Sequence, residues 1–516
     1  MAYRFLKKFR VVLSLVFFLL LLVCFVDTYH LTGQWSDGLL KWQFVPALLS
    51  AVTGSVTIIL LLVLLTLLFG RVYCSTLCPL GTYQDIVRRI ANWFKNKKKR
   101  KLKYSKPHHL VRYLLLGVVA VGFVLGSSTL LLKLDPYSNF GRMAANLLRP
   151  AVIWSGNALS NTFSAIPFQD YKIFTMSACL FAAAVFIVVT TLSALRGRLY
   201  CNSICPVGSL LGVLSKYSLF RLALNSDTCA RCMACVKACK GQCIDIKKQE
   251  IDHTRCVQCH NCTSACRTQQ SIRYQFAYQP LPNPPQRGGS KYPLLGKGEA
   301  GGRRLFLGTI GGIAAAGAVR AFTPAWRASS THTKAITPPG SRGLDHFKRH
   351  CTACHACVAG CPSHVLRPAV SEYGLDGFMM PVLDYNKSFC NYACNTCSTI
   401  CPNGAIIPLS KEEKILTQIG KANFILDRCI VVREETDCGA CDEHCPVKAI
   451  RMVPFRDGLL IPQLDTSLCI GCGGCEYICP ARPDKAIQVI ANTEHQQARP
   501  VEEDVQEQVE VDDFGF

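Results

Sequence analysis

Long uncharged apolar stretches dominate the first 220 residues of the chain. There are four such stretches, and the last three each reach the roughly 20 residues that a helix needs to cross hydrocarbon. The first is shorter, and snorkelling of Lys7, Lys8 and Arg10 would complete it. Buried core helices are the alternative, but a soluble core is not expected to use a run such as Leu-Leu-Leu-Val-Leu-Leu-Thr-Leu-Leu on all faces. The pattern predicts a polytopic α-helical membrane domain over residues 1–220, with four spans at 11–26, 44–69, 113–132 and 173–195.

Basic residues are distributed unevenly around these spans. They precede the first span, follow the fourth at Arg196 and Arg198, and fill the connection between the second and third at Lys95, Lys97, Lys98, Lys99, Arg100, Lys101 and Lys103. Because cytoplasmic connections carry the excess of Lys and Arg, these parts and the N-terminus are expected in the cytoplasm. A lysine run directly beside a span is typical of contact with anionic lipid, so it does not indicate nucleic-acid binding.

A twelve-residue motif occurs twice in the membrane half. Gly-Arg-Val-Tyr-Cys-Ser-Thr-Leu-Cys-Pro-Leu-Gly at 70–81 matches Gly-Arg-Leu-Tyr-Cys-Asn-Ser-Ile-Cys-Pro-Val-Gly at 197–208. Each copy follows the second span of a two-span hairpin, and two hairpins of the same orientation imply a pseudo-twofold axis along the membrane normal. The motif therefore predicts one site where Cys74, Cys78, Cys201 and Cys205 converge. The alternative is that they are inert thiols of a helix-terminating turn.

Cysteine dominates the rest of the chain. Twenty-four of the 31 cysteines fall into six groups of four, each of which contains C-x2-C followed by x3-C. In the bacterial ferredoxin run, three close thiolates hold three corners of a 4Fe–4S cube, and the distal one ligates the neighbouring cube. Zinc sites use pairs set apart by a longer loop, and disulfides would not explain the repeated spacing. The groups therefore predict six 4Fe–4S clusters, held by Cys229, Cys232, Cys235 and Cys239; Cys256, Cys259, Cys262 and Cys266; Cys351, Cys354, Cys357 and Cys361; Cys390, Cys394, Cys397 and Cys401; Cys429, Cys438, Cys441 and Cys445; and Cys469, Cys472, Cys475 and Cys479.

Three groups depart from the regular run. The group at Cys390 has three residues in its first gap, and that at Cys429 has eight. Cys243 follows Cys239 by four residues and is an alternative fourth ligand, although the spacing favours Cys239.

The two sets of cluster groups are separated by a segment rich in Pro and Gly, which cannot hold a core. Arg303 and Arg304 then precede a weakly apolar stretch, which indicates a twin-arginine export signal for a folded domain, with a fifth span as the alternative. The predicted organisation also contains two α+β ferredoxin-like modules. It consists of a membrane domain at 1–220, a cytoplasmic two-cluster ferredoxin domain at 221–275, a linker at 276–300, the signal or fifth span at 301–322, a four-cluster ferredoxin domain outside at 345–490, and an acidic disordered tail at 491–516.

The formal net charge of +23 overstates the positive character of the chain. Ligand cysteines must be thiolates to bind iron, so the true charge is well below that value and gives no reason to expect nucleic acid. The sequence contains no haem-attachment motif, no Rossmann glycine fingerprint and no phosphate-binding loop. Flavin, nicotinamide and ATP are therefore not expected as cofactors.

The membrane half, with its spans, paired C-x3-C-P motifs and two ferredoxin groups, resembles the NapH-type membrane ferredoxins. The half from Arg303 resembles NapG or MauM proteins, which are four-cluster ferredoxins with a twin-arginine signal. The resemblance implies a fused quinol dehydrogenase in the cytoplasmic (inner) membrane, which takes electrons from quinol and passes them to a periplasmic reductase, typically nitrate reductase, or to a small cytochrome. It also implies that Cys74, Cys78, Cys201 and Cys205 serve quinol oxidation as catalytic residues. Together with the intervals, the family's two-lobe build leads us to expect distal cysteines of the outer set to exchange between the first and last groups and between the second and third.

A second hypothesis stays open. Related membrane ferredoxins with C-x3-C-P motifs serve nitrous-oxide reduction, and MauM relatives accompany methylamine oxidation. The chain would then be a transmembrane relay or maturation factor that reduces a partner's metal centre without oxidising quinol. The sequence leaves the terminal acceptor, the quinone, the cleavage of the export signal, the oligomeric state and the cluster potentials open.

Overall fold

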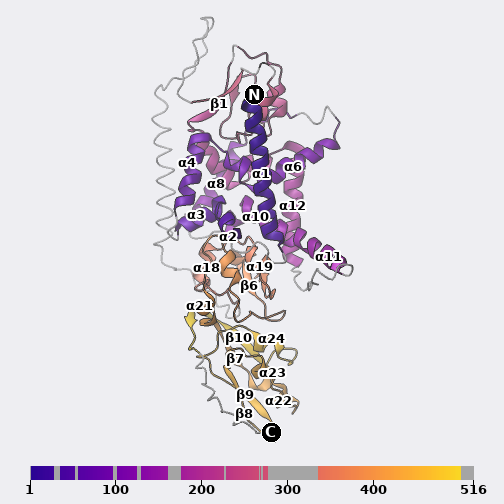
Figure 1. Cartoon of the computed structure of the whole chain (residues 1–516), viewed down its shortest axis with the longest axis vertical. Coiled ribbons are helices and arrows are strands. Elements are labelled where there is room, and N and C mark those ends of the chain that lie inside the picture. The colour runs from indigo at the N-terminus through magenta and orange to yellow at the C-terminus, as the bar shows by residue number, and fades with distance from the viewer. Residues whose placement is uncertain are drawn as a thin grey trace, which may run out of the picture.

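The computed structural model describes residues 2–27, 35–52, 56–96, 102–124, 129–160, 176–225, 228–266, 268, 271–276 and 335–500. The expected twin-arginine segment and linker therefore lie outside the described residues, apart from Phe276. The chain is elongated (Figure 1): a small sheet module lies at one end, a helical part occupies the centre, and two further lobes lie at the other end.

Two helices among the described residues are long and apolar enough to cross a membrane: α1 (Ala2–Val26), through its stretch Phe5–Val26, and α12 (Met176–Arg196). The other two expected spans are each described as two helices with undescribed residues between them. These helices are α3 (Phe44–Val52) with α4 (Thr57–Phe69), and α8 (His109–Val124) with α9 (Thr129–Leu134). A continuous second and third span therefore stays a prediction.

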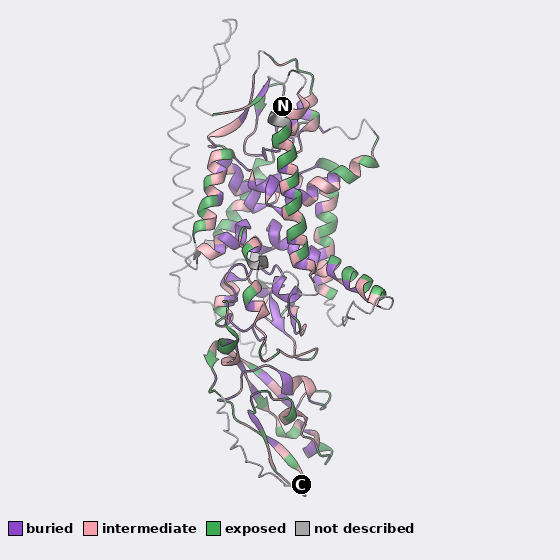
Figure 2. Ribbon diagram, viewed as in Figure 1, coloured by how far each residue is buried: buried purple, intermediate pink, exposed green. Residues whose placement is uncertain are grey.

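Exposed residues line the outside of the helical part (Figure 2), and many of them are large and apolar. Leu60 of α4 is 66% exposed, Leu110 of α8 is 80% exposed and Ile187 of α12 is 61% exposed, and α1 carries further exposed Phe, Leu and Val. Soluble monomers rarely expose contiguous apolar surface on several neighbouring elements. This surface is suited to lipid.

Shorter helices complete the helical part. Its described helices also include α2 (Trp35–Lys41), α5 (Tyr73–Thr76), α6 (Pro79–Trp93), α10 (Pro136–Met143), the π-helical turn η1 (Ala144–Leu148), α11 (Arg149–Ser160), α13 (Leu199–Ser203) and α14 (Pro206–Ser215). The start of α10 is locally encoded. Pro136 occupies the first turn, where its missing N–H costs nothing, and the Asp135 carboxylate accepts the Ser138 N–H at 2.7 Å.

Residues 220–276, which we call the inner module, are closed by their first and last strands. β1 (Phe220–Leu224) pairs antiparallel with β4 (Ile272–Phe276), with Phe220 opposite Phe276. Inside this closure lie α15 (Ala234–Ala238), β2 (Ile244–Asp245), β3 (Glu250–Ile251) and α16 (Asn261–Ala265). α15 and α16 pack together, which brings the two inner cysteine groups side by side.

Residues 335–500, which we call the outer part after the side of the membrane expected for them, form two lobes. The first contains α18 (Leu344–His350), α19 (Ala356–Ala359), β5 (Leu366–Pro368), the 3-10 turn η2 (Leu375–Gly377), β6 (Pro381–Leu383) and α20 (Thr396–Ile400). The second contains α21 (Lys411–Ile415), β7 (Thr417–Phe424), η3 (Leu426–Arg428), α22 (Ile430–Arg433), α23 (Ala440–Glu443), β8 (Ile450–Pro454), β9 (Leu460–Leu464), α24 (Gly474–Ile478) and β10 (Ile487–Gln497).

The outer part extends beyond both expected boundaries. β10 pairs with β7 as far as Gln497 opposite Thr417, so the tail does not begin at 491 as predicted. Ile336, which precedes the expected start at 345, is 2% exposed and packs in the core of the first lobe. Strand pairing therefore fixes the end of the domain later than the predicted boundary.

Candidate functional site

Both copies of the repeated motif fold in the same way. Gly70 and Gly197 have φ of +75° and +74°, a left-handed conformation that favours glycine and lets the chain turn sharply at the ends of α4 and α12. The first cysteine of each copy then lies in a short helix, α5 or α13. The second, Cys78 or Cys205, caps α6 or α14, with the motif proline at the first helical position. The invariant order of glycine, cysteine and proline thus has a local structural cause.

The arginine of each copy forms a hydrogen bond with the backbone of the other copy. Arg71 of the first copy donates to the Cys201 carbonyl of the second at 3.2 Å, and Arg198 of the second donates to the Cys74 carbonyl of the first. The motif's last glycine makes room for this exchange, because a Cβ at Gly208 would lie 2.2 Å from the Cys201 carbonyl oxygen and 2.8 Å from Arg71. The pseudo-twofold relation therefore extends to individual side chains.

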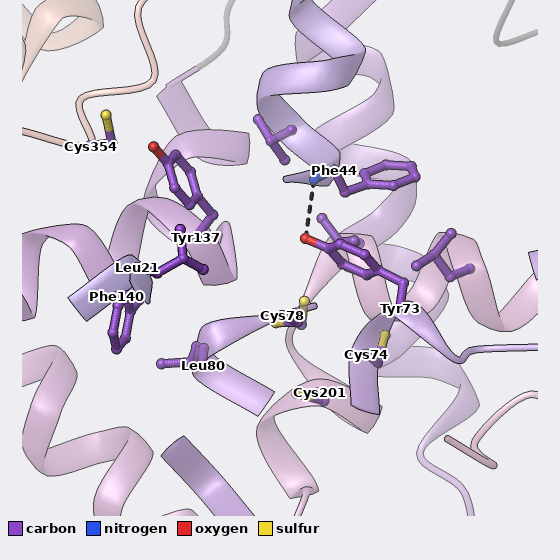
Figure 3. Close-up of a cluster of buried hydrophobic side chains, with 14 of the residues drawn as sticks. Leu21, Phe44, Tyr73, Cys74, Cys78, Leu80, Tyr137, Phe140, Cys201 and Cys354 are labelled. Carbon is purple, nitrogen blue, oxygen red and sulfur yellow. Dashed lines mark hydrogen bonds between the residues drawn. The ribbon is translucent and has the colours of Figure 1, made fainter. Parts of the chain in front are cut away.

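The structure brings the four motif cysteines together in one buried core. Cys74 is 4% exposed, and the other three are 2% exposed. Figure 3 shows Cys74, Cys78 and Cys201 side by side beneath Tyr73. Burial raises the pKa of Cys78 and Cys205 well above the usual thiol value, and the neighbouring thiols raise it further. Without a bound metal these groups are therefore neutral thiols at physiological pH.

Polar side chains surround the thiols. The Gln84 amide donates to the Cys201 sulfur at 3.0 Å, and Arg71 lies 3.8 Å from the Cys74 sulfur. On the opposite side, Tyr73 donates to Gln43 at 3.1 Å. Such an environment can stabilise charge that develops on sulfur.

A buried carboxylate ties the motif to the inner module. Asp85 of α6 accepts from Arg198 at 3.0 and 2.8 Å, and from Lys240 of the inner module at 2.8 Å. Arg10 of α1 lies 3.8 Å away. Burial alone would raise the pKa of Asp85, but Arg198 and Lys240 hold it well below its usual range. Asp85 is therefore ionised and joins α1, the repeat and the inner module.

The last cysteine of each inner group lies with the other group, which is the arrangement of distal ligands in ferredoxins. Burial raises the pKa of Cys235, and the thiols of Cys229 and Cys266 raise it further, so the last cysteine of the second group lies with the first. Burial raises the pKa of Cys262, and thiols of its own group and Cys239 contribute in turn. The sulfurs of Cys239 and Cys243 lie 3.5 Å apart. Because the two sulfurs lie so close together, either could be the fourth ligand, and the choice of Cys239 stays a prediction.

The expected exchange among the outer groups is wrong. Burial raises the pKa of Cys397, and thiols of its own group and Cys361 of the first group raise it further. Burial likewise raises the pKa of Cys357, with contributions from its own group and Cys401 of the second. The first group therefore exchanges with the second, because α19 and α20 pack together, and the third with the fourth, because α23 and α24 do.

Two cavities of the second lobe have walls suited to a cube. Each is lined by three cysteines of one group and the distal cysteine of the other: Cys469, Cys472 and Cys475 with Cys445, and Cys429, Cys438 and Cys441 with Cys479. Backbone N–H groups point at the sulfurs, such as that of Ala449 at 3.2 Å from Cys445 and that of Ala422 at 3.4 Å from Cys469. Four thiols around one cavity, with N–H donors, fit a 4Fe–4S cube, which would supply one-electron chemistry there.

The outer ligand sets follow one another in space in an order different from the chain. We name them outer sites 1 to 4: Cys351, Cys354, Cys357 and Cys401; Cys390, Cys394, Cys397 and Cys361; Cys429, Cys438, Cys441 and Cys479; and Cys469, Cys472, Cys475 and Cys445. Site 1 lies against the helical part, where Arg142 donates to the Ala353 carbonyl at 3.0 Å. Site 2 touches site 4 through a Cys390 N–H to Cys472 carbonyl bond of 2.9 Å. Site 4 in turn lies beside site 3, since the Cys441 thiol of site 3 is close enough to raise the pKa of Cys475 in site 4.

Several residues that build this arrangement were not predicted. The arginines of the repeat had a signal, because both stand at the same position of a duplicated motif. Asp85 and Arg142 had none, since one carboxylate or one arginine in a helix is ordinary until its surroundings are known.

Known proteins match both halves of the chain. A family model described as a 4Fe-4S binding domain matches residues 52–101 and 179–225, which contain both copies of the repeat and end before Cys229. A model described as a 4Fe-4S dicluster domain matches residues 436–482. No solved structure matches the chain.

Three curated relatives are ferredoxin-type proteins. The chain is 29% identical to NapF of Escherichia coli over 158 residues, which is 31% of this chain and 86% of the relative. It is 30% identical over 201 residues to the methylamine utilization protein MauM of Methylobacillus flagellatus, covering 36% of this chain and 79% of the relative. It is 31% identical over 190 residues to NapH of Escherichia coli, covering 37% of this chain and 53% of the relative.

Proposed function

This chain belongs to the ferredoxin-type iron–sulfur proteins as a fusion of NapH-type and MauM-type halves, and we propose that it carries electrons from membrane quinol through six 4Fe–4S clusters to an acceptor on the other side. The iron–sulfur and electron-transfer parts of this statement follow from the family. The quinol, the number of clusters and the direction are the proposal.

One observation carries the proposal. A single continuous buried core contains Cys259 of the inner module, the four motif cysteines and Cys354 of outer site 1. The motif cysteines thus lie between two sets of cluster ligands, where electrons would enter. Because a quinol gives two electrons and a cube accepts one at a time, something must split the electron pair.

The four thiols are suited to that role. If a pair of them starts as a disulfide, it takes two electrons and two protons from the quinol, which leaves as quinone, and two thiols remain. The thiols are then reoxidised one electron at a time, while their protons depart. Alternatively, the thiols form the surface on which the quinone head group binds.

The length of α1 supports a transmembrane arrangement. α1 contacts α16 of the inner module and α19 of the outer part, and its 25 residues span about 37 Å at 1.5 Å per residue. Together with the exposed apolar helices and the basic residues, this length supports an inner membrane location, with the inner module in the cytoplasm and the outer lobes in the periplasm. Lipid, quinone and a periplasmic reductase, such as nitrate reductase, or a small cytochrome are the proposed partners.

A second candidate function is a transmembrane relay that reduces a partner's metal centre without oxidising quinol. Two observations favour it. The four motif thiols are almost entirely enclosed, and the matching 4Fe-4S family model covers them rather than the inner groups. In this case the motif cysteines would hold a cluster of their own.

Replacing Cys74 and Cys201 together by serine separates the two candidates. If quinol enters at the thiols, the variant keeps its iron but quinol no longer reduces its clusters. If the thiols hold a cluster, iron content falls. Cys24→Ser with Cys179→Ser is the matched control, because these lone cysteines of α1 and α12 lie outside the motif. Normal quinol reduction with full iron content would contradict both functions of the motif.

A further inference from the structure

Tyr137 of α10 has a buried hydroxyl without a regular hydrogen-bond partner among the described residues. The side chain is 0% exposed, and its ring packs against Phe25 at a centroid distance of 5.7 Å. Figure 3 shows the hydroxyl directed at the Cys354 sulfur of outer site 1. A buried donor that is left unpaired is costly, so the hydroxyl requires an acceptor that forms in the working protein.

The position of Cys354 opposite Tyr137 is fixed by three contacts. Arg142, one turn further along α10, donates to the carbonyls of Ala353 at 3.0 Å and Leu132 at 3.0 Å. Asn146 lies 3.0 Å from the His355 ring nitrogen. Gly141 is pressed so closely against the cluster loop that a Cβ there would lie 2.5 Å from the Cys354 carbonyl oxygen. The loop therefore cannot shift easily relative to α10.

We propose that the Tyr137 hydroxyl donates a hydrogen bond to the Cys354 thiolate when outer site 1 holds its cluster, so that the membrane half raises the reduction potential of the first outer cluster. The inference rests on the proposed loading of site 1 with a 4Fe–4S cube. A neutral thiol is a weak acceptor, whereas a thiolate that ligates iron accepts strongly, so loading of site 1 would give the Tyr137 hydroxyl a partner. A hydrogen bond to a ligand sulfur stabilises the reduced, more negative cluster.

The consequence is a preferred electron acceptor at the junction of the halves. One electron leaves a reduced donor in the membrane half and reduces the cluster of site 1, while Tyr137 keeps its proton throughout. The tuning depends on docking, because donor and acceptor belong to different halves of the chain. A separated outer part would have a first cluster that is harder to reduce.

The test is Tyr137→Phe in the full-length, iron-loaded protein, with a redox titration monitored by EPR. We expect all clusters to be retained, and the reduced-to-oxidised ratio of one outer cluster at fixed poise to fall about tenfold, equal to about 59 mV for one electron. Tyr373→Phe is the matched control. Its hydroxyl is also buried in the first lobe, but it donates to the Ile336 and Pro381 carbonyls at 3.1 and 3.0 Å. It should leave every potential unchanged.

A second variant keeps the inference testable if Tyr137→Phe folds poorly. Gly141→Ala retains Tyr137 but pushes the Cys354 loop away, so it should lower the same potential, while Gly117→Ala in α8, where a Cβ meets nothing within 4 Å, should not. Full iron content with unchanged potentials in Tyr137→Phe, or in Gly141→Ala if the first variant fails to fold, would overturn the inference. If the purified unmodified protein contains no iron, the proposed function itself would be overturned.

Discussion

The helical part holds an iron–sulfur module at each end, but the two attachments differ in kind. The inner module is fastened by charge: Asp85 accepts from Lys240 of that module and from Arg198 of the repeat. In the outer attachment the cation Arg142 donates to neutral backbone carbonyls, and Gly141 and Tyr137 provide close packing. The inner attachment uses residues that also hold the four-cysteine centre, whereas the outer one uses α10, which lies outside the repeat.

Because the attachments differ, a structural change at one module should spread further through the helical part than a change at the other. A shift of the inner module moves Arg198 and with it the Cys74 carbonyl to which Arg198 donates. A shift of the outer lobe acts on the repeat less directly, through the hydrogen bonds from Arg142 to Asn139 at 3.3 Å and from Asn139 to the Tyr200 hydroxyl at 3.2 Å. We therefore expect damage at the inner attachment to spread to the centre, and damage at the outer attachment to remain local.

The largest effect is expected from Asp85→Ala. It leaves Arg198 buried without its carboxylate, and breaking a buried ion pair from one side costs about 3–5 kcal/mol. Unfolding of the protein in detergent, followed by helical content, should show this loss. Asp484→Ala is the control, since the Asp484–Arg428 pair at 3.6 Å is exposed and is expected to contribute less than about 1 kcal/mol. Equal losses in both variants would contradict the anchoring role of Asp85.

The same carboxylate sets the pH dependence of the inner attachment. The pKa of Asp85 is lowered in the folded protein, so its stabilisation is fully present above the carboxyl's unfolded pKa and is lost only as pH falls through the lowered folded value. Between pH 5 and pH 8, the contribution should be constant. Stability curves of the unmodified protein and Asp85→Ala should run parallel over this range and converge in strong acid.

At the outer attachment, Arg142→Gln should cost about 2–3 kcal/mol, because it removes charge-assisted hydrogen bonds to the Ala353 and Leu132 carbonyls. Hydrogen exchange should rise in residues 351–357 and remain unchanged in the repeat at 70–81. Arg451→Gln on an exposed position of β8 is the control. Faster exchange throughout the repeat would show that the outer attachment is not local.

Gly208→Ala tests the contact between the two copies of the repeat. The added Cβ would meet the Cys201 carbonyl oxygen at 2.2 Å, and overpacking of this kind costs about 1–3 kcal/mol. Gly81→Ala should have a similar effect, because its Cβ would lie 2.4 Å from the Cys74 carbonyl oxygen. Gly38→Ala, where nothing lies within 4 Å, is the control for both melting-temperature measurements. A large difference between the two motif variants would contradict the pseudo-twofold relation.

The smallest effect is expected far from both attachments. Ser410 caps α21 in a capping box with Glu413, so Ser410→Ala should cost about 1 kcal/mol. Hydrogen exchange should rise only around α21. Lys411→Ala, in the same helix but without a role in the cap, is the control, and equal exchange in the two variants would show that the cap contributes nothing.

Local chemistry was predictable from the sequence, and contacts between distant segments were not. The cysteine spacing and the repeat are carried by neighbouring residues, so the ferredoxin relationship and the candidate centre could be inferred. The exchange between outer groups depends on which helices pack together, and the spacing within a group gives no preference for a partner. Tyr137 likewise could not be distinguished from other tyrosines, because its significance comes from Cys354, more than two hundred residues later.

The crossed arginines of the repeat make the centre resemble the interface of a symmetric dimer within one chain. Arg71 and Arg198 each belong to one hairpin and donate to a backbone carbonyl of the other, so both hairpins are needed to form these two hydrogen bonds. In an isologous interface the same surface serves both partners, and a change in one copy requires a matching change in the second. The smallest unit that can form this centre is therefore two hairpins, and a chain containing only one would have to pair with a second molecule of itself.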